Sequence, residues 1–431
     1  MKGYVAMMTT RWMLRVILCA VLANVVLAQG PVKPSGAGTA GNPYQISQLG
    51  HLVWMGNNVG TSSGTYYTVQ SDIDASSTTN WNNGAGFAPI GTNSDIFAGT
   101  NAVPFMGIFD GAGKVIRHLT MFRTNQNYVG LFGLVGSGAS VVNLGLEASR
   151  VAGNMHVGAL AGYNYDGGTV SVCYATGLVS GGDRVGGLVG GNEGAMSVCH
   201  SMVTVAGSTN VGGLVGIDYT LGTMNMCYAE GSATGGQNVG GLVGGSSGWS
   251  VNDSYATCTV AGTNGVGGLV GGNIGYGISR CYAAGAVTGS TNVGGLAGYN
   301  SGSVNNSYWD TNHTGQANSA GGIGRTTAQM KMQATFVGWD FTNVWRIGEN
   351  VSYPYLALPP RMAAPVMGTG PAVMLRWCSV TNYSYTVHYS TNLLSGFSVL
   401  QGGIPAKPPD NSYTDNVTGV NAKFWKVSAE H

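Results

Sequence analysis

The chain has 431 residues, of which 73 are glycine and only 8% are charged, and its formal net charge is +1. An ordinary soluble domain has about 25% charged residues, so the polar surface here must come from Asn, Ser, Thr and the backbone. The hydrophobic fraction of 44% argues against simple disorder. The lack of a basic patch argues against nucleic-acid binding through phosphate contacts.

The first 28 residues are predicted to be a signal peptide. Basic residues precede an apolar run at 16–28, and small or medium-sized side chains precede the expected cleavage point near Ala28. The alternative is a single membrane anchor, but the run is short for ~30 Å of hydrocarbon. We therefore expect a secreted or cell-surface protein with no membrane span after signal removal, beginning with a Pro/Gly/Ser-rich spacer at 29–41.

Residues 42–128 are expected to form an N-terminal cap and irregular coils. One helix is predicted at 47–58, where Ser47 can cap the helix and apolar residues can form one face. Strands are predicted at 66–73 and 105–121. A helix at this end would protect the first edge strand of a β-structure.

A short string of the form Val-Gly-Gly-Leu-Val-Gly recurs about every 27 residues, a period that indicates a solenoid. Its copies begin at Tyr128, Val157, Val185, Val211, Val239, Val266 and Val293. The glycines exclude an apolar helical stripe, whereas short apolar segments between Gly clusters are typical of strands and turns. A single unit cannot bury its own apolar face. We therefore predict an all-β fold in which a parallel β-helix (solenoid) with ~27-residue coils of three short strands occupies 129–310.

A second string between these copies contains Cys or Ser followed by Tyr or His. The position before the Cys is Asp253 in one coil and Arg280 in another, so it should face solvent and the Cys position should face inward. The next position then faces outward and forms a column of candidate binding residues: Tyr174, His200, Tyr228, Tyr255, Tyr282 and Tyr308. Such a column could bind glycans or host or matrix surface proteins. The alternative is that the rings only pack on one another.

The Gly-Gly pair of the first string is expected to turn a corner. Val185 and Leu188 have opposite parity in a strand, yet both look buried. A bend or bulge with glycine at positive φ would resolve this conflict.

The repeats resemble the GLUG motif, a Gly-Leu-x-Gly repeat of bacterial surface and secreted proteins. The resemblance covers about 41–358, including a leader with segments such as 107–111 and a tail with segments such as 353–356. It implies a β-solenoid at the cell surface; some relatives are reported as adhesins, and some repeats accompany IgA-cleaving metallopeptidases. The His-Glu-x-x-His motif of those peptidases is absent from this sequence, so the resemblance does not imply that activity.

The segment after the repeats is divided into three parts. Residues 311–358 are expected to cap the solenoid and to include a short helix at 326–332, and a Pro-rich linker follows at 359–365. Alternating segments beyond it predict a small β-sandwich at 366–431. This module resembles the fibronectin-III-like modules of exported bacterial proteins, with 389–393 as the cue.

No cofactor, metal or catalytic site is predicted. Four cysteines at equivalent positions are interpreted as buried thiols rather than disulfides, because their side chains would point in parallel: Cys173, Cys199, Cys227 and Cys281. No tetrahedral Cys/His set for zinc is evident. The charged groups of the repeats are interpreted as solvated turn residues rather than acid/base pairs: Asp166, Asp183, Arg184, Glu193 and Asp218. Three further carboxylates could bind Ca²⁺: Asp72, Asp74 and Asp110. The sequence, however, lacks the repeated Asp-rich nonapeptide of calcium-binding β-rolls.

The sequence therefore predicts an exported binding or adhesion protein, at the cell surface or outside the cell, that is not an enzyme. One alternative is a carbohydrate-active β-helix enzyme, such as a polysaccharide lyase or hydrolase. Another is a structural spacer. Fold alone does not choose among these functions.

Overall fold

The computed structural model describes residues 29–59, 63–91, 103–219, 222–247, 250–275 and 277–357, and six C-terminal segments: 366–367, 372–378, 384–391, 398–405, 410–416 and 423–430. The expected signal peptide (1–28) and linker (359–365) lie outside these residues.

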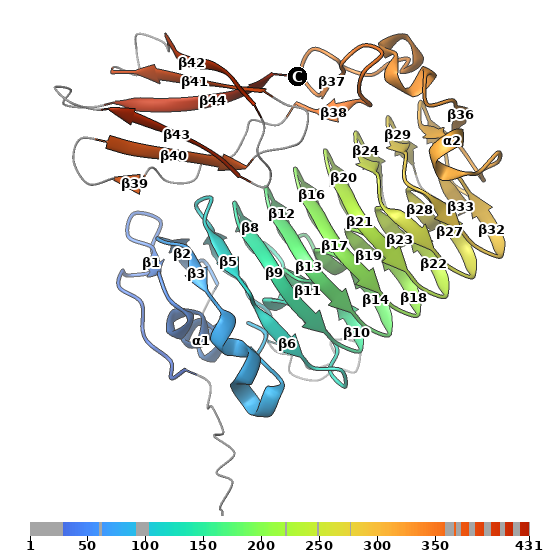
Figure 1. The fold of residues 1–431 in the computed structure, drawn as a ribbon. Coiled ribbons are helices and arrows are strands. Elements are labelled where there is room, and N and C mark those ends of the chain that lie inside the picture. Colours follow the sequence, from blue (N-terminus) through green and yellow to red (C-terminus); the bar gives the residue numbers. More distant parts are fainter. Residues whose placement is uncertain are drawn as a thin grey trace, which may run out of the picture.

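The protein is nearly all β, and its centre is a parallel β-solenoid, as predicted (Figure 1). Each strand pairs in parallel register with its equivalent one coil later, for example Tyr174 with His200 and His200 with Tyr228. The first sheet has 10 strands: β1 (Tyr44–Ile46), β2 (Tyr66–Val69), β4 (Ile108–Asp110), β8 (Ser140–Val142), β12 (Thr169–Ser171), β16 (Ala195–Ser197), β20 (Thr223–Asn225), β24 (Val251–Asn252), β29 (Ile278–Ser279) and β34 (Val304–Asn305).

The second sheet carries the predicted tyrosine column and has 13 strands: β3 (Ile73–Asp74), β5 (Val115–Arg117), β6 (Thr120–Phe122), β9 (Gly145–Ala152), β13 (Tyr174–Ser180), β17 (His200–Ala206), β21 (Tyr228–Thr234), β25 (Tyr255–Ala256), β26 (Thr259–Ala261), β30 (Tyr282–Ala283), β31 (Val287–Thr288), β35 (Tyr308–Asp310) and β36 (Ile323–Arg325).

Two further sheets come from the Val-Gly-Gly-Leu-Val-Gly strings. The third sheet has 6 strands: β10 (Met155–Val157), β14 (Asp183–Gly186), β18 (Thr209–Gly212), β22 (Gln237–Gly240), β27 (Asn264–Gly267) and β32 (Thr291–Gly294). The fourth has 7 strands: β7 (Phe132–Val135), β11 (Ala161–Asn164), β15 (Val189–Asn192), β19 (Val215–Asp218), β23 (Val243–Ser246), β28 (Val270–Asn273) and β33 (Ala297–Asn300). A coil thus has four strands instead of the expected three, because each string bends in its middle and supplies two.

The bend occurs at Gly187 and Leu188, and it lets Val185, Leu188 and Val189 all reach the core. The expectation of a glycine at positive φ in this pair is wrong. The left-handed residue lies just before the first Val instead, and the column it forms is mostly not glycine: Tyr128, His156, Arg184, Asn210, Asn238, Gly265 and Asn292. The glycines of the bend serve close packing, since a Cβ on Gly186 would lie 2.0 Å from the carbonyl oxygen of Val189.

Side-chain parity in the second sheet follows the prediction. The cysteine position is fully buried in Cys173, Cys199, Cys227 and Cys281, and Ser254 and Ser307 occupy it in the remaining coils. The described cysteines of the solenoid form no disulfide with one another. Stacked coils therefore share one apolar interior, as solenoid repeats require.

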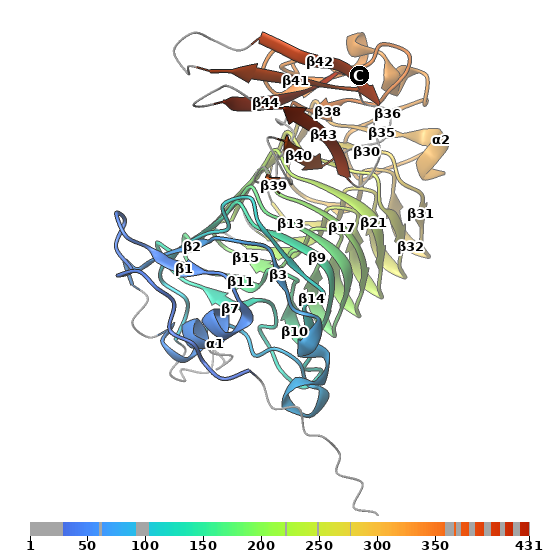
Figure 2. The same ribbon diagram turned by 60° about the vertical axis from the view of Figure 1, so that its left-hand side comes forward.

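Irregular segments close both ends of the solenoid (Figures 1 and 2). Helix α1 (Leu49–Asn57) buries Leu49, Leu52 and Met55 at the N-terminal end; its N-cap is Gln48 rather than Ser47, without a capping side-chain hydrogen bond. A 3-10 segment follows β3 (Ser76–Gly84). After the last coil come α2 (Thr311–Thr314), two 3-10 turns (Gln329–Lys331 and Gln333–Thr335), β37 (Trp345–Arg346) and β38 (Tyr355–Leu356).

The C-terminal strands form two small antiparallel sheets of three strands each. One contains β39 (Val366–Met367), β40 (Ala372–Cys378) and β43 (Asp410–Asn416), and the other β41 (Ser384–Ser390), β42 (Ser398–Pro405) and β44 (Phe424–Glu430). Both sheets contribute to one small apolar core, which includes Leu375 and Val387. The fibronectin-III-like identity of this module stays a prediction.

Candidate functional site

The predicted tyrosine column is a stack of parallel rings. Ring centroids from Tyr174 through His200, Tyr228 and Tyr255 to Tyr282 are 4.6 to 5.1 Å apart, and adjacent planes differ by only 2° to 6°. This spacing is that of the coils themselves, ~4.8 Å. In-register parallel pairing therefore forces the rings to stack.

This column is not the exposed surface that parity suggested. Its side chains do point away from the solenoid core, but four of the six are less than 10% exposed: Tyr174 (6%), Tyr255 (8%), Tyr282 (2%) and Tyr308 (2%). His200 and Tyr228 are half-buried. The expected binding column is thus largely inaccessible.

The elements that cover Tyr255, Tyr282 and Tyr308 come from the C-terminal cap. The chain after the last coil folds back along the second sheet and forms an apolar cluster with Tyr255, Tyr282 and Tyr308. Trp345 packs 6.2 Å from the rings of both Tyr255 and Tyr282, and the Tyr282 hydroxyl donates to the backbone oxygen of Pro354 at 2.8 Å. Burial among these groups raises the pKa of Tyr282 well above its ordinary value.

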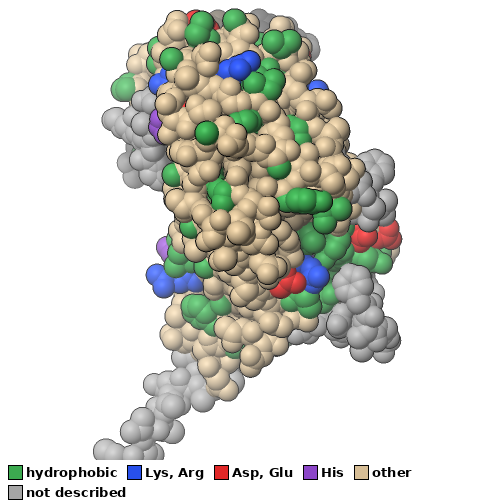
Figure 3. Space-filling model, turned by 90° about the vertical axis from the view of Figure 1, so that its right-hand side faces the viewer, with side chains coloured by type: hydrophobic (Ala, Val, Ile, Leu, Met, Phe, Trp, Pro, Cys, Tyr) green, Lys and Arg blue, Asp and Glu red, His purple; other side chains and the backbone are tan. Residues whose placement is uncertain are grey.

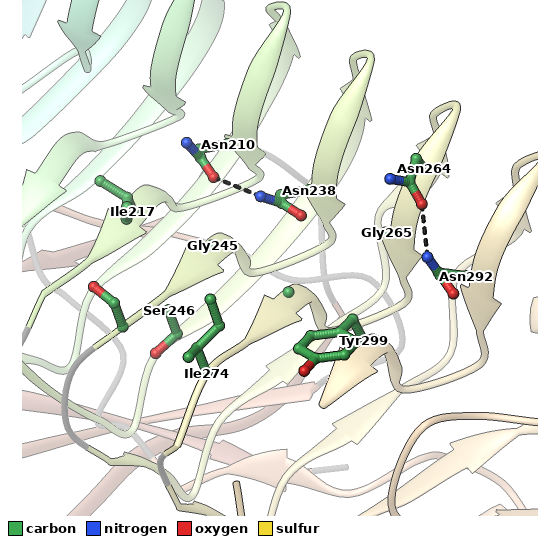
Figure 4. A pocket seen from close by; sticks show the side chains of 12 residues that line it. Asn210, Ile217, Asn238, Gly245, Ser246, Asn264, Gly265, Ile274, Asn292 and Tyr299 are labelled. Carbon is green, nitrogen blue, oxygen red and sulfur yellow. Dashed lines mark hydrogen bonds between the residues drawn. The ribbon is translucent and has the colours of Figure 1, made fainter. Parts of the chain in front are cut away.

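An exposed groove lies on a different side of the solenoid, where the third and fourth sheets meet (Figure 4). It has a volume of about 250 Å³. One side carries the left-handed column, with Asn210, Asn238 and Asn292, and Ile274 lies on the side opposite. Ile217 and Tyr299 stand at the two ends of the groove. Gly245 and Gly272 form the floor between them, in register with Ile217 and Tyr299. We call this site the amide groove.

The wall of the amide groove is a ladder of asparagine side chains. Asn210 donates from Nδ2 to Asp183 Oδ1 at 3.0 Å, and Asn238 donates to Asn210 Oδ1 at 3.0 Å. Asn292 donates to Asn264 Oδ1 at 2.8 Å. Asparagine tolerates the left-handed conformation better than most residues, so one residue type satisfies both the backbone corner and the ladder.

The ladder is interrupted at Gly265, which occupies the corner of the coil after Asn238 with φ of 66°. Because this residue has no side chain, no described protein group donates a hydrogen bond to Asn238 Oδ1. A Cβ on Gly265 would lie 2.8 Å from that oxygen, and a Cβ on Gly272 would lie 2.9 Å from it. The oxygen therefore faces a notch between two glycines. The sequence predicted none of this, although an Asn-x-Gly-x pattern at the corners was a visible signal.

Ionisable groups gather at one end of the same face, in the coils before the amide groove. Tyr163 lies in the same register column as Ile217 and Tyr299, to which Gly191 connects it. The Tyr163 hydroxyl donates to Glu193 Oε2 at 3.1 Å. His156 Nε2 and the hydroxyl oxygen of Tyr219 share a hydrogen bond and lie 3.1 Å apart. The structure thus brings Glu193 to an aromatic cluster, whereas the sequence suggested only scattered turn residues.

The environment of this cluster holds His156 and Tyr163 neutral. Burial, with a smaller contribution from Arg184, lowers the pKa of His156 to about 3. Burial, and then the charge of Glu193, raises the pKa of Tyr163 far above its ordinary value. A general base needs a pKa near the working pH. Neither group meets that requirement, so the cluster is better suited to packing than to proton transfer.

A second polar ladder runs inside the fourth sheet. Asn164 donates to Asn192 Oδ1 at 2.8 Å, and Asn192 donates to Asp218 Oδ1 at 2.7 Å. Asp218 is fully buried, and none of the described residues forms a hydrogen bond with its Oδ2. Burial raises the pKa of Asp218 to about 7, although the bond from Asn192 acts in the opposite direction.

We expect Asp218→Asn to stabilise the protein at high pH. The folded-state pKa is raised above the unfolded value, so the folded protein binds more protons than the unfolded chain between about pH 4 and pH 7. The stability that the protonated Asp218 carboxyl contributes is therefore fully present below about pH 4 and is lost as the pH rises through about 7. Since the amide carries no charge, Asp218→Asn should raise the free energy of unfolding by about 2 kcal/mol at pH 8 and change it little at pH 4. Denaturant titrations at both pH values test this.

Asn192→Asp is the matched control, because it places a second carboxyl in the same ladder. It should destabilise the protein at pH 8 and have a smaller effect at pH 4. Equal stability changes at the two pH values for Asp218→Asn would contradict the buried, partly protonated carboxyl.

Metal-binding clusters, long apolar helices and charged side chains are scarce or absent among the described residues. Among the described residues, no group of three or more His, Cys, Asp and Glu side chains is placed to hold a metal ion. The helices that the structure describes are all too short or too polar to cross a membrane. Uncharged side chains and backbone dominate the face shown in Figure 3, with few Lys, Arg, Asp or Glu.

Comparisons with known proteins support the fold more than a function. A structure named "putative immunoglobulin A1 protease" from Bacteroides ovatus matches with a TM-score of 0.51 and 20% identity, covering 75% of this chain and 94% of that one. At this identity the likeness shows the solenoid fold alone. No family model matches the chain, so the resemblance to GLUG repeats stays a prediction.

Two curated proteins match part of the chain. Halomucin of Haloquadratum walsbyi is 36% identical over 157 residues, which are 36% of this chain and 2% of halomucin. A protein of Evansella cellulosilytica named "Putative Gly-rich membrane protein" is 34% identical over 152 residues, which are 35% of this chain and 16% of that protein. The matches thus cover a small part of each relative.

Proposed function

We propose that the protein is an exported binding or adhesion protein, at the cell surface or outside the cell, and that it performs no catalysis. The observation that carries this proposal is the amide groove, an open site with hydrogen-bonding and apolar walls on a rigid stack of coils. The names of its two partial relatives, halomucin and a Gly-rich membrane protein, fit a surface location. The ligand classes are glycans or host or matrix surface proteins.

The rigid fold supports binding over a flexible spacer. The strands of the groove floor pair on both sides with neighbouring coils, so the walls keep their spacing without a ligand. A preformed site avoids the entropy cost of ordering loops on association. A spacer would need no such site, and the chain would then show no saturable binding.

An enzyme is the second candidate, since one structural neighbour is named as a protease and Tyr163 and Glu193 are hydrogen-bonded. The neutral state of Tyr163 and His156 argues against it. A polysaccharide lyase or hydrolase would be expected to show a charged acid/base pair at an open site.

The purified chain should be tested against a panel of immobilised polysaccharides and extracellular-matrix proteins, with release of reducing sugar and of peptide measured in parallel. Saturable binding without turnover is the expected result. Turnover of any panel member would replace the proposal with an enzyme, and no binding anywhere would leave a structural spacer.

A further inference from the structure

The amide groove follows the axis of the solenoid rather than crossing it. Its lining residues come from four successive coils, which carry Asn210, Asn238, Gly265 and Asn292 at their corners. Three intervals of ~4.8 Å make a site about 14 Å long. A linear chain lying along the axis would therefore meet one corner residue in each coil.

The lining residues carry no charge. They are asparagine, serine, glycine, isoleucine and tyrosine. The nearest carboxylate bonded to the ladder is Asp183, which is paired with Arg184 at 3.2 Å. A phosphate or uronate polymer would lose hydration here without gaining a cation, because burying an unpaired charge is costly. The site thus favours an uncharged ligand.

The polar groups of the groove are suited to hydroxyl groups. Asn238 Oδ1 faces the notch between Gly265 and Gly272 and accepts no hydrogen bond from the part of the chain that the structure describes. A ligand hydroxyl can donate to this oxygen and also accept a hydrogen bond, as hydroxyls do both. In the open groove water can donate to this oxygen, and a ligand hydroxyl that takes the place of that water would keep the hydrogen bond and complete the interrupted ladder.

Two apolar side chains that line the groove are exposed. Ile274 is 60% exposed and Tyr299 is 49% exposed, and both line the groove. The C–H face of a sugar ring can pack on such side chains while its hydroxyls reach the amides opposite. Scattered exposed apolar residues need no explanation, but these two lie beside an unfilled site.

A peptide fits the groove less well. Extended peptides usually bind by adding a strand to a free sheet edge. The floor strands β23 and β28 are central strands, each paired in parallel with neighbours on both sides. No backbone edge is available at the floor, so a peptide would gain only side-chain contacts.

We propose that the amide groove binds an extended, uncharged polysaccharide chain of the β-1,4-linked type, with its axis along the solenoid. This inference rests on the proposed binding function and names its site and ligand class. A β-1,4 linkage gives an extended chain that can follow the coils, whereas α-1,4-linked chains curve away from a straight line.

Calorimetric titration of the chain with cellohexaose, xylohexaose and mannohexaose tests the proposal, with maltohexaose and an oligogalacturonate as the curved and charged comparisons. At least one of the three extended neutral chains should bind, and the comparisons should bind about tenfold more weakly or not at all. Binding only by maltohexaose, or only by the oligogalacturonate, would overturn the proposal.

Two groove variants locate the site. Gly265→Asn introduces the residue found at equivalent corners, so its backbone is tolerated at φ of 66°, and its amide would donate to Asn238 and fill the notch. Tyr299→Ala removes the exposed aromatic ring at one end of the groove. Each should weaken binding about tenfold or more, while the melting temperature stays near that of the wild type.

The matched controls lie far from the groove. Gly113→Asn makes the same change at another left-handed glycine, in the turn between β4 and β5. Phe122→Ala removes an aromatic ring of similar exposure, 46%. Both should leave affinity within about twofold.

The outcomes separate this inference from the proposed function. Binding that neither Gly265→Asn nor Tyr299→Ala weakens would overturn the groove assignment while leaving a binding protein. Absence of all panel binding would remove both. If Gly265→Asn lowers the melting temperature, Tyr299→Ala alone decides the site.

Discussion

Replacing Gly240 by alanine is expected to break the solenoid at that coil. A Cβ at this position would lie 1.9 Å from the carbonyl oxygen of Val243 and 2.7 Å from the amide nitrogen of Gly271. Both are backbone atoms of paired strands, so neither can move without loss of the ladder. We expect the free energy of unfolding to fall by roughly 3 kcal/mol or more, measured by denaturant titration.

Gly272→Ala is the matched control in the adjoining coil. Its nearest neighbour, 2.9 Å away, is the oxygen of the Asn238 side chain, which can rotate aside. The cost should stay within about 1 kcal/mol. An equal loss of stability for Gly240→Ala and Gly272→Ala would show that the motif glycines matter for flexibility rather than for space.

This contrast explains the recurring string. Gly186, Gly212, Gly240, Gly267 and Gly294 lie in one register column, and at each of them a Cβ would lie 1.9 to 2.0 Å from a carbonyl oxygen. None of these five is in the left-handed region. The glycines therefore repeat because the bend brings two backbones together, and not because the chain needs positive φ.

Periodicity and alternation predicted much of the fold. A string returning about every 27 residues indicates stacked coils whatever its details, and period-2 parity placed the Cys position and its neighbour on opposite faces. Both inferences depend only on local geometry within a coil. The residues they concern, such as Cys227 and Tyr228, lie as expected relative to the solenoid core.

The same reasoning could not predict which outward side chains are exposed. Whether Tyr282 meets solvent depends on Trp345 and Pro354, which follow the repeats and fold back over them. Asp253 was expected to face solvent, yet it is only 7% exposed because Arg280 of the next coil and Trp345 both bind it. Contacts between a repeat and a non-repeating cap leave no periodic signal.

The amide groove was missed for a different reason. Its walls depend on which residue adopts the left-handed corner, and Asn210 and Asn238 look like ordinary turn residues in the sequence. Only the register between coils shows that Gly265 interrupts their ladder. A surface built from one residue per coil becomes visible when the coils are stacked.

Trp345→Ala is expected to detach the C-terminal cap from the tyrosine stack. The Trp345 side chain is fully buried, its ring centroid lies 4.3 Å from that of Trp339, and its Nε1 donates to Asp253 Oδ1 at 3.2 Å. Truncating a buried Trp costs about 3–5 kcal/mol. We expect the free energy of unfolding to fall by that amount and Tyr282 to become accessible to solvent.

Conservative and surface substitutions separate packing from hydrogen bonding. Trp345→Phe keeps an aromatic ring against Trp339 and loses the bond to Asp253, whose carboxylate still pairs with Arg280 at 2.7 Å; its cost should be about 1–2 kcal/mol. Val337→Ser, at a cap residue that is 68% exposed, should have almost no effect.

The cap and the coils should respond differently to Trp345→Ala, because they are held by different forces. Coils such as those of β17 and β21 are held by backbone ladders on both sides and by their own apolar interior. The cap holds to the stack mainly through aromatic packing and a few hydrogen bonds. Limited proteolysis should therefore cleave the cap of Trp345→Ala early while the β-signal in circular dichroism persists. Simultaneous loss of cap and coils would instead show that the cap is required for the solenoid to fold.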